Sequence, residues 1–110
     1  MAKCEKMVTG DFDEILQKLN AAVMINSMSA TYEDGSDFSN DGFRCAVRVY
    51  ERYSILGSNR VSLNITLAGK EGNYFLSAIT SGGSQAIRMK LNTYGEESFL
   101  DTIKDVVDSL

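Results

Sequence analysis

The chain has 110 residues, of which 44% are hydrophobic and 24% charged. These values suit one globular domain and leave no room for a second, so we predict a single domain over residues 1–110. The sequence contains no His, Trp or Pro, and the absence of His removes the commonest general base and metal ligand. We therefore expect no enzymatic activity, no catalytic residue, no metal and no cofactor.

The charge of the chain is acidic overall but unevenly distributed. Eleven basic and fifteen acidic residues give a net charge of −4, which makes nucleic acid an unfavourable partner. Seven of the basic residues lie between positions 43 and 90, where the acids are Glu51 and Glu71. The sequence has no apolar run of about 18 residues and no signal-peptide pattern, so we expect a cytoplasmic protein without membrane contact. Cys4 and Cys45 are too few for a disulfide framework and are expected to be buried, reduced thiols.

The first part of the chain predicts a strand, a helix and a second strand. Residues 2–9 show a weak strand pattern. Asp11 with Glu14 resembles a capping box, and Phe12 opens an apolar stripe at helical spacing that ends near Asn26. Residues 28–33 predict the second strand, and the turn-forming residues of 34–42 predict an exposed loop.

The middle of the chain alternates apolar and polar residues with a period of two, which predicts four half-buried strands. The apolar positions are odd-numbered: Phe43, Cys45, Val47, Val49, Tyr53, Ile55, Val61, Leu63, Ile65, Leu67, Phe75, Ile79, Ile87, Met89 and Leu91. If the odd side chains of all four strands share one face, each hairpin loop holds an odd number of residues. We therefore predict hairpin loops at residues 57–59, 70–72 and 81–85.

The end of the chain predicts a second amphipathic helix. Thr93 and Glu96 match a capping box, and apolar residues follow at helical spacing from Phe99 to Leu110. Two such helices can cover the apolar face of the sheet. The predicted fold is a two-layer α+β domain, with an antiparallel β-meander sheet and both helices on one face, in the order β-α-β-β-β-β-β-α.

The sheet face that points away from the helices is the predicted binding surface. Even-numbered residues with basic, aromatic or apolar side chains lie together there: Arg48, Tyr50, Arg52, Tyr74, Leu76, Arg88 and Lys90. Arginine and tyrosine are enriched at interface centres, and aromatic rings flanked by cations also suit anionic ligands. Three interpretations stay open: an ordinary solvated face, self-association, and binding of a small anionic ligand or of single-stranded nucleic acid, the latter being disfavoured by the net charge.

Two local features give weaker signals. The segment Ser81-Gly82-Gly83-Ser84 can present backbone N–H groups to an anion, but a flexible hairpin loop is the simpler interpretation because no helix start follows it. Glu51 is the one carboxylate in the predicted inward row. It is expected to reach an arginine or solvent, or to mark a β-bulge, with a bulge or a sheet edge favoured.

Several segments are distinctive as sequences, among them Glu51-Arg52-Tyr53-Ser54, residues 77–86 and residues 94–100. Together with the opening Gly10-Asp11-Phe12 they resemble a family of short uncharacterised proteins of about this length from Gram-positive anaerobic bacteria. The resemblance covers nearly the whole chain. It implies a bacterial cytoplasmic origin and no specific activity or binding residue.

The sequence therefore favours a small non-enzymatic interaction or assembly protein. We expect a homodimer formed through the outer sheet face or through an exposed edge strand. The alternative is a binding domain for a small apolar or anionic ligand, held between helices and sheet or on the basic and aromatic face. An enzyme is the least favoured class, with Glu51, Cys45 and the segment 81–84 as its only reactive groups.

Overall fold

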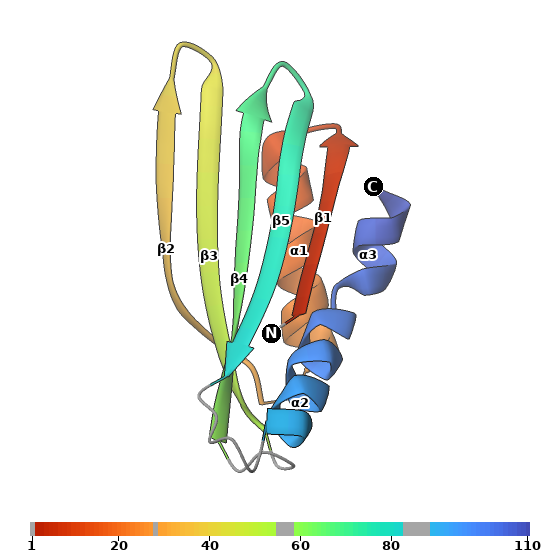
Figure 1. Ribbon diagram of the computed structural model, residues 1–110. Helices are drawn as coiled ribbons and strands as arrows, with labels where there is room; N and C mark the ends of the chain where they lie inside the picture. The colour runs from red at the N-terminus through yellow and green to blue at the C-terminus, as the bar shows by residue number, and fades with distance from the viewer. Residues whose placement is uncertain (1, 28, 55–58, 83–88) are drawn as a thin grey trace.

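The described part of the chain forms eight elements (Figure 1). They are β1 (Ala2–Thr9), α1 (Phe12–Asn26), β2 (Thr31–Asn40), β3 (Phe43–Ser54), β4 (Asn59–Lys70), β5 (Asn73–Gly82), α2 (Met89–Asp101) and α3 (Lys104–Ser109). The computed structural model describes residues 2–27, 29–54, 59–82 and 89–110. Within these ranges the helices pack against one face of a five-stranded antiparallel sheet, whose spatial order is β1-β5-β4-β3-β2.

The predicted fold class is confirmed. β2 to β5 form a meander of consecutive antiparallel neighbours, and β1 pairs antiparallel with β5 at the other edge of the sheet. The order of elements follows the expected one as far as β5. The strand expected around residues 86–92 is wrong, because α2 already begins at Met89.

The first helix forms where the capping signal places it. The Asp11 carboxylate accepts a hydrogen bond from the Glu14 backbone N–H at 2.9 Å, which satisfies one of the free donors at the helix start. Ser27 is the C-cap. The apolar stripe packs into the core, so both the limits and the buried face of α1 are as predicted. Its buried residues are Phe12, Ile15, Leu19, Ala22 and Val23.

Two tight turns decide which way the strands face. Asp41 and Gly42 join β2 to β3 with φ values of 51° and 84°, and Glu71 and Gly72 join β4 to β5 with φ values of 58° and 79°. Two consecutive residues with positive φ are the mark of a type I′ hairpin turn. The predicted three-residue loop at 70–72 is therefore wrong.

The remaining loop predictions lie mostly outside the described residues. Asn59 belongs to β4, Ser81 and Gly82 belong to β5, and the rest of the segments 57–59 and 81–85 is not described.

The two-residue turn at Glu71 and Gly72 reverses β5 relative to the prediction. The register of β3 with β4, in which Ser54 lies opposite Asn59, reverses β3. β4 buries its odd-numbered side chains as expected, whereas β3 and β5 bury even-numbered ones. Tyr50 of β3 lies opposite Leu63 of β4, which lies opposite Thr80 of β5. The prediction that odd side chains point inward in every strand is thus wrong for two strands.

The core lies between the helices and the covered face of the sheet. The sheet contributes Val8, Ala46, Tyr50, Val61, Leu63, Ile65, Leu67, Tyr74, Leu76 and Ala78. The opposite face is called the open face below. Along the paired parts of the strands it carries Lys3, Glu5, Met7, Thr9, Thr31, Asp34, Ser36, Phe38, Asn40, Phe43, Cys45, Val47, Val49, Glu51, Tyr53, Arg60, Ser62, Asn64, Thr66, Ala68, Lys70, Asn73, Phe75, Ser77, Ile79 and Ser81.

The predicted C-terminal helix is divided into α2 and α3. Thr102 Oγ1 donates to the Phe99 carbonyl oxygen at 2.8 Å, a local contact that competes with the regular helical ladder. The Asn26 side chain of α1 donates to the Thr102 carbonyl oxygen at 2.8 Å. The break between the helices is therefore held against the end of α1.

The start of this helical region also differs from the prediction. Thr93 and Glu96 lie inside α2 rather than at its start, so the predicted capping box is wrong. The apolar stripe itself is as predicted. Phe99, Ile103 and Val107 are buried, and Leu100, Val106 and Leu110 pack against the core.

β2 occupies the segment for which a strand at 28–33 and a loop at 34–42 were predicted. It pairs with β3 from Thr31 opposite Glu51 to Asn40 opposite Phe43, so the loop prediction is wrong. The strand is exposed along almost its whole length because it is the sheet edge furthest from the helices (Figure 1). Its Asp and Ser residues suit an edge, where charges and polar groups discourage further pairing.

Candidate functional site

Of the seven residues nominated as an outer binding surface, none of the six that the structure describes lies on the outer face of the sheet. Those of β3 and β5 lie on the covered face: Arg48, Tyr50, Arg52, Tyr74 and Leu76. Lys90 belongs to α2 rather than to a strand, and Arg88 lies outside the described residues. The placement of the predicted surface is therefore wrong, and the reversal of β3 and β5 is the physical reason.

Arg44 connects β3 to the start of α1. Its guanidinium makes a bidentate pair with the Asp13 carboxylate at 2.9 and 3.1 Å, and it stacks 4.1 Å from the centre of the Phe12 ring. The hydrogen bond and charge of Arg44 lower the pKa of Asp13. Arg44 thus covers an aromatic core residue with its planar group while its charge is paired near the surface.

Arg52 connects β3 to α2 and to the C-terminal end of α1. Its guanidinium lies 4.7 Å from the centre of the Phe99 ring and donates to the hydroxyl groups of Ser98 and Ser27 at 2.9 and 3.3 Å. Partial burial lowers the pKa of Arg52, but a guanidinium remains protonated in proteins. The contacts join the sheet to α2 and to the C-cap of α1, which is a structural role.

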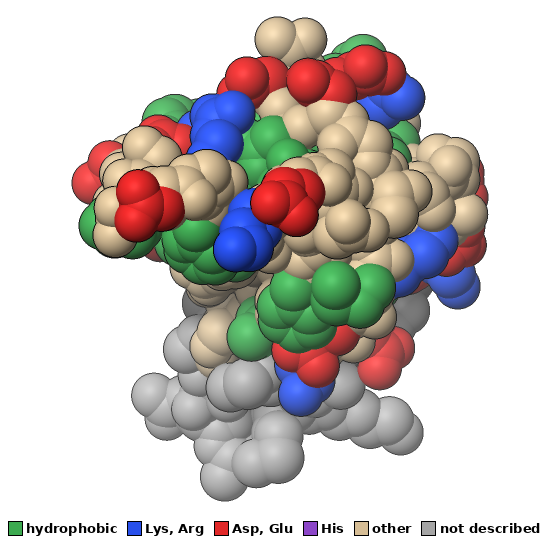
Figure 2. Space-filling model, turned by 90° about the horizontal axis from the view of Figure 1, so that it is seen from above, with side chains coloured by type: hydrophobic (Ala, Val, Ile, Leu, Met, Phe, Trp, Pro, Cys, Tyr) green, Lys and Arg blue, Asp and Glu red, His purple; other side chains and the backbone are tan. Residues whose placement is uncertain are grey.

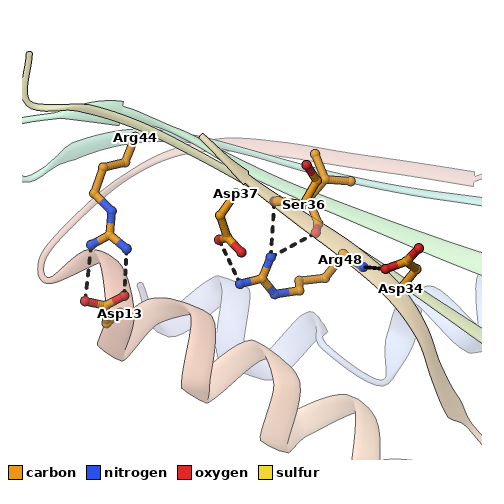
Figure 3. A network of polar contacts seen from close by, with 8 residues as sticks. Asp13, Asp34, Ser36, Asp37, Arg44 and Arg48 are labelled. Carbon is orange, nitrogen blue, oxygen red and sulfur yellow. Dashed lines mark hydrogen bonds and ion pairs between the residues drawn. The ribbon is translucent and has the colours of Figure 1, made fainter. Parts of the chain in front are cut away.

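Arg48 lies between these two arginines and turns toward β2. It pairs with Asp37 at 2.9 Å and donates to the backbone carbonyl oxygens of Val47 and Ser36 at 3.0 and 3.3 Å. Figure 3 shows this pair beside the Arg44 pair, both on the side of the hairpin that faces α1. Arg48 therefore reaches the edge of a cleft between the hairpin and the helix, which also contains Tyr32.

Tyr50 and Tyr74 pack into the core but keep polar contacts for their hydroxyl groups. The Tyr50 hydroxyl donates to Asn20 Oδ1 at 2.7 Å, and the Tyr74 hydroxyl accepts from the Gly72 backbone N–H at 3.3 Å. Burial raises the pKa of Tyr50, although the nearby positive charge of Arg48 partly opposes this change. Both tyrosines are thus parts of the fold rather than of an exposed recognition surface.

The open face carries a row of apolar side chains that crosses all five strands. The strand registers place these residues side by side: Met7, Phe75, Ala68, Cys45 and Phe38. Three of them are strongly exposed, with relative exposures of 65% for Met7, 60% for Phe38 and 39% for Phe75. Phe43, the first residue of β3, extends the row toward the β2–β3 turn, with its ring 6.5 Å from that of Phe38. We call these six residues the apolar row.

The charged residues of the open face nearly balance one another. Lys3 pairs with Glu5 at 3.7 Å, and Arg60 approaches Glu51 at 2.8 Å and Glu33 at 3.9 Å. Glu51 therefore lies on the open face rather than in an inward row, and of the expected alternatives it is the contact with an arginine, not the favoured bulge, that the structure shows. Seen from the hairpin end, the surface shows hydrophobic side chains among charges of both signs (Figure 2).

The two cysteines lie on opposite faces of the sheet. Both are free and only partly buried. Cys45 belongs to the apolar row, and Cys4 packs against the core from β1. The expected free thiols are confirmed, whereas full burial is wrong for both. Of the segment 81–84, Ser81 and Gly82 end β5, and the remainder lies outside the described residues.

Sequence reasoning missed the residues of the open face because it assigned them to the core. Phe43, Cys45 and Phe75 were predicted to point inward, and Met7 was interpreted as a residue that fills the core. The missed signal is Asp41-Gly42, the dipeptide most typical of a two-residue hairpin. A hairpin at this position makes β2 a full strand and places Phe38 on the same face as Cys45.

The geometry of the described residues defines a small two-layer α+β protein whose sheet has one open face. The chain belongs to the DUF6054 family, a family of unknown function whose model matches residues 1–110. Searches of curated proteins and of solved structures gave no match.

Two further findings concern the part of the chain that the structure describes. None of its helices is both long and apolar enough to cross a membrane. Its Cys, Asp and Glu side chains also form no group of three that could hold a metal ion.

Proposed function

We propose that this chain is a small non-enzymatic assembly protein that forms a homodimer through the open face of its sheet. The apolar row carries the proposal, because it crosses the whole sheet without a covering helix in the described residues. Exposed apolar patches that extend over several neighbouring residues mark interaction surfaces in soluble proteins. A second copy packed on the open face would cover it, as the helices cover the opposite face of the sheet.

The dimensions of the open face suit a stable dimer. Five strands about 4.8 Å apart, each about ten residues long at about 3.3 Å per residue, give a face of roughly 700–800 Å². A specific interface of standard size buries about 800 Å² on each partner. One copy of the sheet can therefore supply such an interface if most of its open face is covered.

The charges of the open face favour a second copy over a partner of strong opposite charge. Its ion pairs lie within the chain, between Lys3 and Glu5 and between Arg60 and Glu51, so the face has little net field. Two identical faces of this kind do not repel each other, whereas a nucleic acid would find no basic surface on it. Two sheets stacked about 10 Å apart around a two-fold axis would bring the apolar row of each copy against the other.

The oligomeric state tests the proposal. We expect size-exclusion chromatography with light scattering to show a dimer of the wild type between about 5 and 500 μM. Met7→Glu or Phe38→Glu should raise the dissociation constant of the dimer at least about thirtyfold, because the loss of one interface anchor costs about 2 kcal/mol. Ile25→Glu is the matched control, because Ile25 is 77% exposed on α1. A wild-type chain that stays monomeric throughout this range would refute the proposal.

Cross-linking adds a test of the face that is used. Cys45 lies in the apolar row and Cys4 lies on the covered side. A short bismaleimide should therefore link two copies of the wild type and of Cys4→Ser, but not of Cys45→Ser. Linking that depends on Cys4 instead would place the interface elsewhere and contradict the proposed arrangement.

The proposal extends to the origin of the chain. The sequence resemblance supports a Gram-positive anaerobic bacterium as the source, and two free cysteines are consistent with the reducing cytoplasm of such a cell. Fractionation of the native cells with an antibody against the chain tests this location. Recovery in the culture medium would contradict it.

A further inference from the structure

The covered side of the sheet has an open cleft between α1 and the β2–β3 hairpin. Its volume is about 400 Å³, which falls in the range of small-molecule sites. Asp13, Leu16, Gln17 and Asn20 of α1 form one wall, and Tyr32, Arg48 and Tyr50 form the other. The cleft therefore combines two aromatic rings, one cation, one carboxylate and two side-chain amides, on the side of the sheet opposite the apolar row.

Two irregularities of β2 build the aromatic wall. The register between β2 and β3 shifts between Tyr32 and Asp34, and this bulge turns Tyr32 toward the helix side, where its ring packs edge-on against Tyr50 with centroids 5.6 Å apart. Gly35 leaves the necessary space, since a Cβ there would overlap the Tyr32 hydroxyl and lie 2.8 Å from the Val47 carbonyl oxygen. Bulges of this kind often redirect a side chain beside a functional site.

The guanidinium of Arg48 is held in place at the edge of the cleft. Its side chain is 23% exposed. One contact to Asp37 and two to backbone carbonyl oxygens fix its orientation. A guanidinium carries five N–H donors, so these three contacts within the described residues leave it able to bind a further acceptor. A fixed, planar cation of this kind recognises a carboxylate better than a mobile lysine does.

The charges around the cleft limit what Arg48 can bind. Asp13 is paired with Arg44, and Asp37 is paired with Arg48 itself, so the two carboxylates are balanced by two guanidinium groups (Figure 3). A single negative charge on a ligand is then tolerated, whereas a polyanion such as a triphosphate finds no excess positive charge. The ring of Tyr32, a residue that is 50% exposed, and the partly buried side chain of Leu16 offer apolar contact to a flat ligand.

We propose that this cleft binds a small planar aromatic monocarboxylate, with the carboxylate on Arg48 and the ring against Tyr32. The site lies on the opposite side of the sheet from the proposed dimer interface, so the two proposals stand or fall separately. With about ten non-hydrogen atoms, such a ligand is expected to bind with a dissociation constant on the order of 1 mM.

The test uses 4-hydroxybenzoate as the probe and the full chain, followed by nitrogen-proton NMR. Saturable shifts are expected at the amides of α1 and of the β2–β3 hairpin. Arg48→Met should weaken binding about tenfold or more, and Gly35→Ala should weaken it by displacing Tyr32. Arg60→Met is the matched control, because Arg60 belongs to β4 and pairs with Glu51 on the open face, and its affinity should equal that of the wild type.

Two comparisons make the result decisive. Cyclohexanecarboxylate has the same charge without a flat ring and should bind several-fold more weakly. If Arg48→Met does not fold, Arg48→Lys replaces it. The absence of saturable shifts up to about 20 mM 4-hydroxybenzoate, far above the expected dissociation constant, would overturn the proposal. Equal binding by the Arg48 variant and the wild type would overturn it as well.

Discussion

Two substitutions of Tyr50 separate the contribution of its ring from that of its hydroxyl group. The side chain is 1% exposed beneath the helices, and Tyr50→Ala is expected to lower the free energy of unfolding by about 3–5 kcal/mol, as other large-to-small core changes do. Tyr50→Phe removes only the hydrogen bond to Asn20. Since Asn20 is exposed and can bind water instead, the expected loss is about 1 kcal/mol.

Urea unfolding followed by circular dichroism measures both values. A chain of this size has a total stability of about 5–15 kcal/mol, so the alanine variant should unfold at a much lower urea concentration than the phenylalanine variant. A loss below about 1 kcal/mol for Tyr50→Ala is the value expected for a surface position. That result would refute the conclusion that the even-numbered side chains of β3 point into the core. The assignment of the open face would then be wrong as well.

The pH dependence gives an independent check of the same side chain. Burial raises the pKa of Tyr50 in the folded state above its ordinary value, so the unfolded chain loses this proton first as the pH rises. Stability therefore decreases from about pH 10 upward. The free-energy advantage of the wild type over Tyr50→Phe should shrink in this range, and an advantage that grows would contradict the burial of the hydroxyl group.

Three smaller predictions follow from other positions. Gly69→Ala should destabilise the chain by about 1–3 kcal/mol, because its φ is +152° and a Cβ would overlap the Asn73 carbonyl oxygen; an unchanged urea midpoint would disprove this close approach. Glu71→Asn should stabilise by about 0.5 kcal/mol, because Glu71 has a positive φ of 58° and asparagine tolerates this conformation better; a lower melting temperature would count against it. Because the pKa of Asp13 is lowered in the folded state, the stability of the wild type should fall as the pH drops below about 4. Asp13→Asn should make this decrease smaller. If the stability of the wild type and of Asp13→Asn depends on acid pH in the same way, the pair between Asp13 and Arg44 does not form in solution.

The elements of the fold were predictable because their local signals agree with the tertiary structure. The capping box at Asp11 and the stripe that follows it mark α1 to the residue. In β4, the odd-numbered residues from Val61 to Leu67 face the core as their alternation predicts. These segments have only one apolar face, so the pattern admits one orientation.

The site was not predictable from alternation because both faces of the sheet carry apolar residues. In β3, Cys45, Val47 and Val49 point outward, whereas Arg44 and Arg52 point inward and lie over aromatic rings of the helices. A long arginine side chain can cover a core with its apolar stem and planar head, so a basic residue at an inward position gives a misleading polar signal. The turn residues Asp41 and Gly42 place Phe38 and Cys45 on the same face, whereas the face of β3 that is buried follows from its register with β4.

The pairing of β1 with β5 determines how synthesis and folding of this chain are related. Ala2 lies opposite Thr80, so the amino-terminal strand has no neighbour until nearly the whole chain has left the ribosome. The meander from β2 to β5 depends on short-range contacts and can form earlier, since close pairings cost less loop entropy than distant ones. We therefore expect docking of β1 to be a late step in folding, and a nascent chain that stalls before β5 to expose the edge of β4 in addition to the edge of β2.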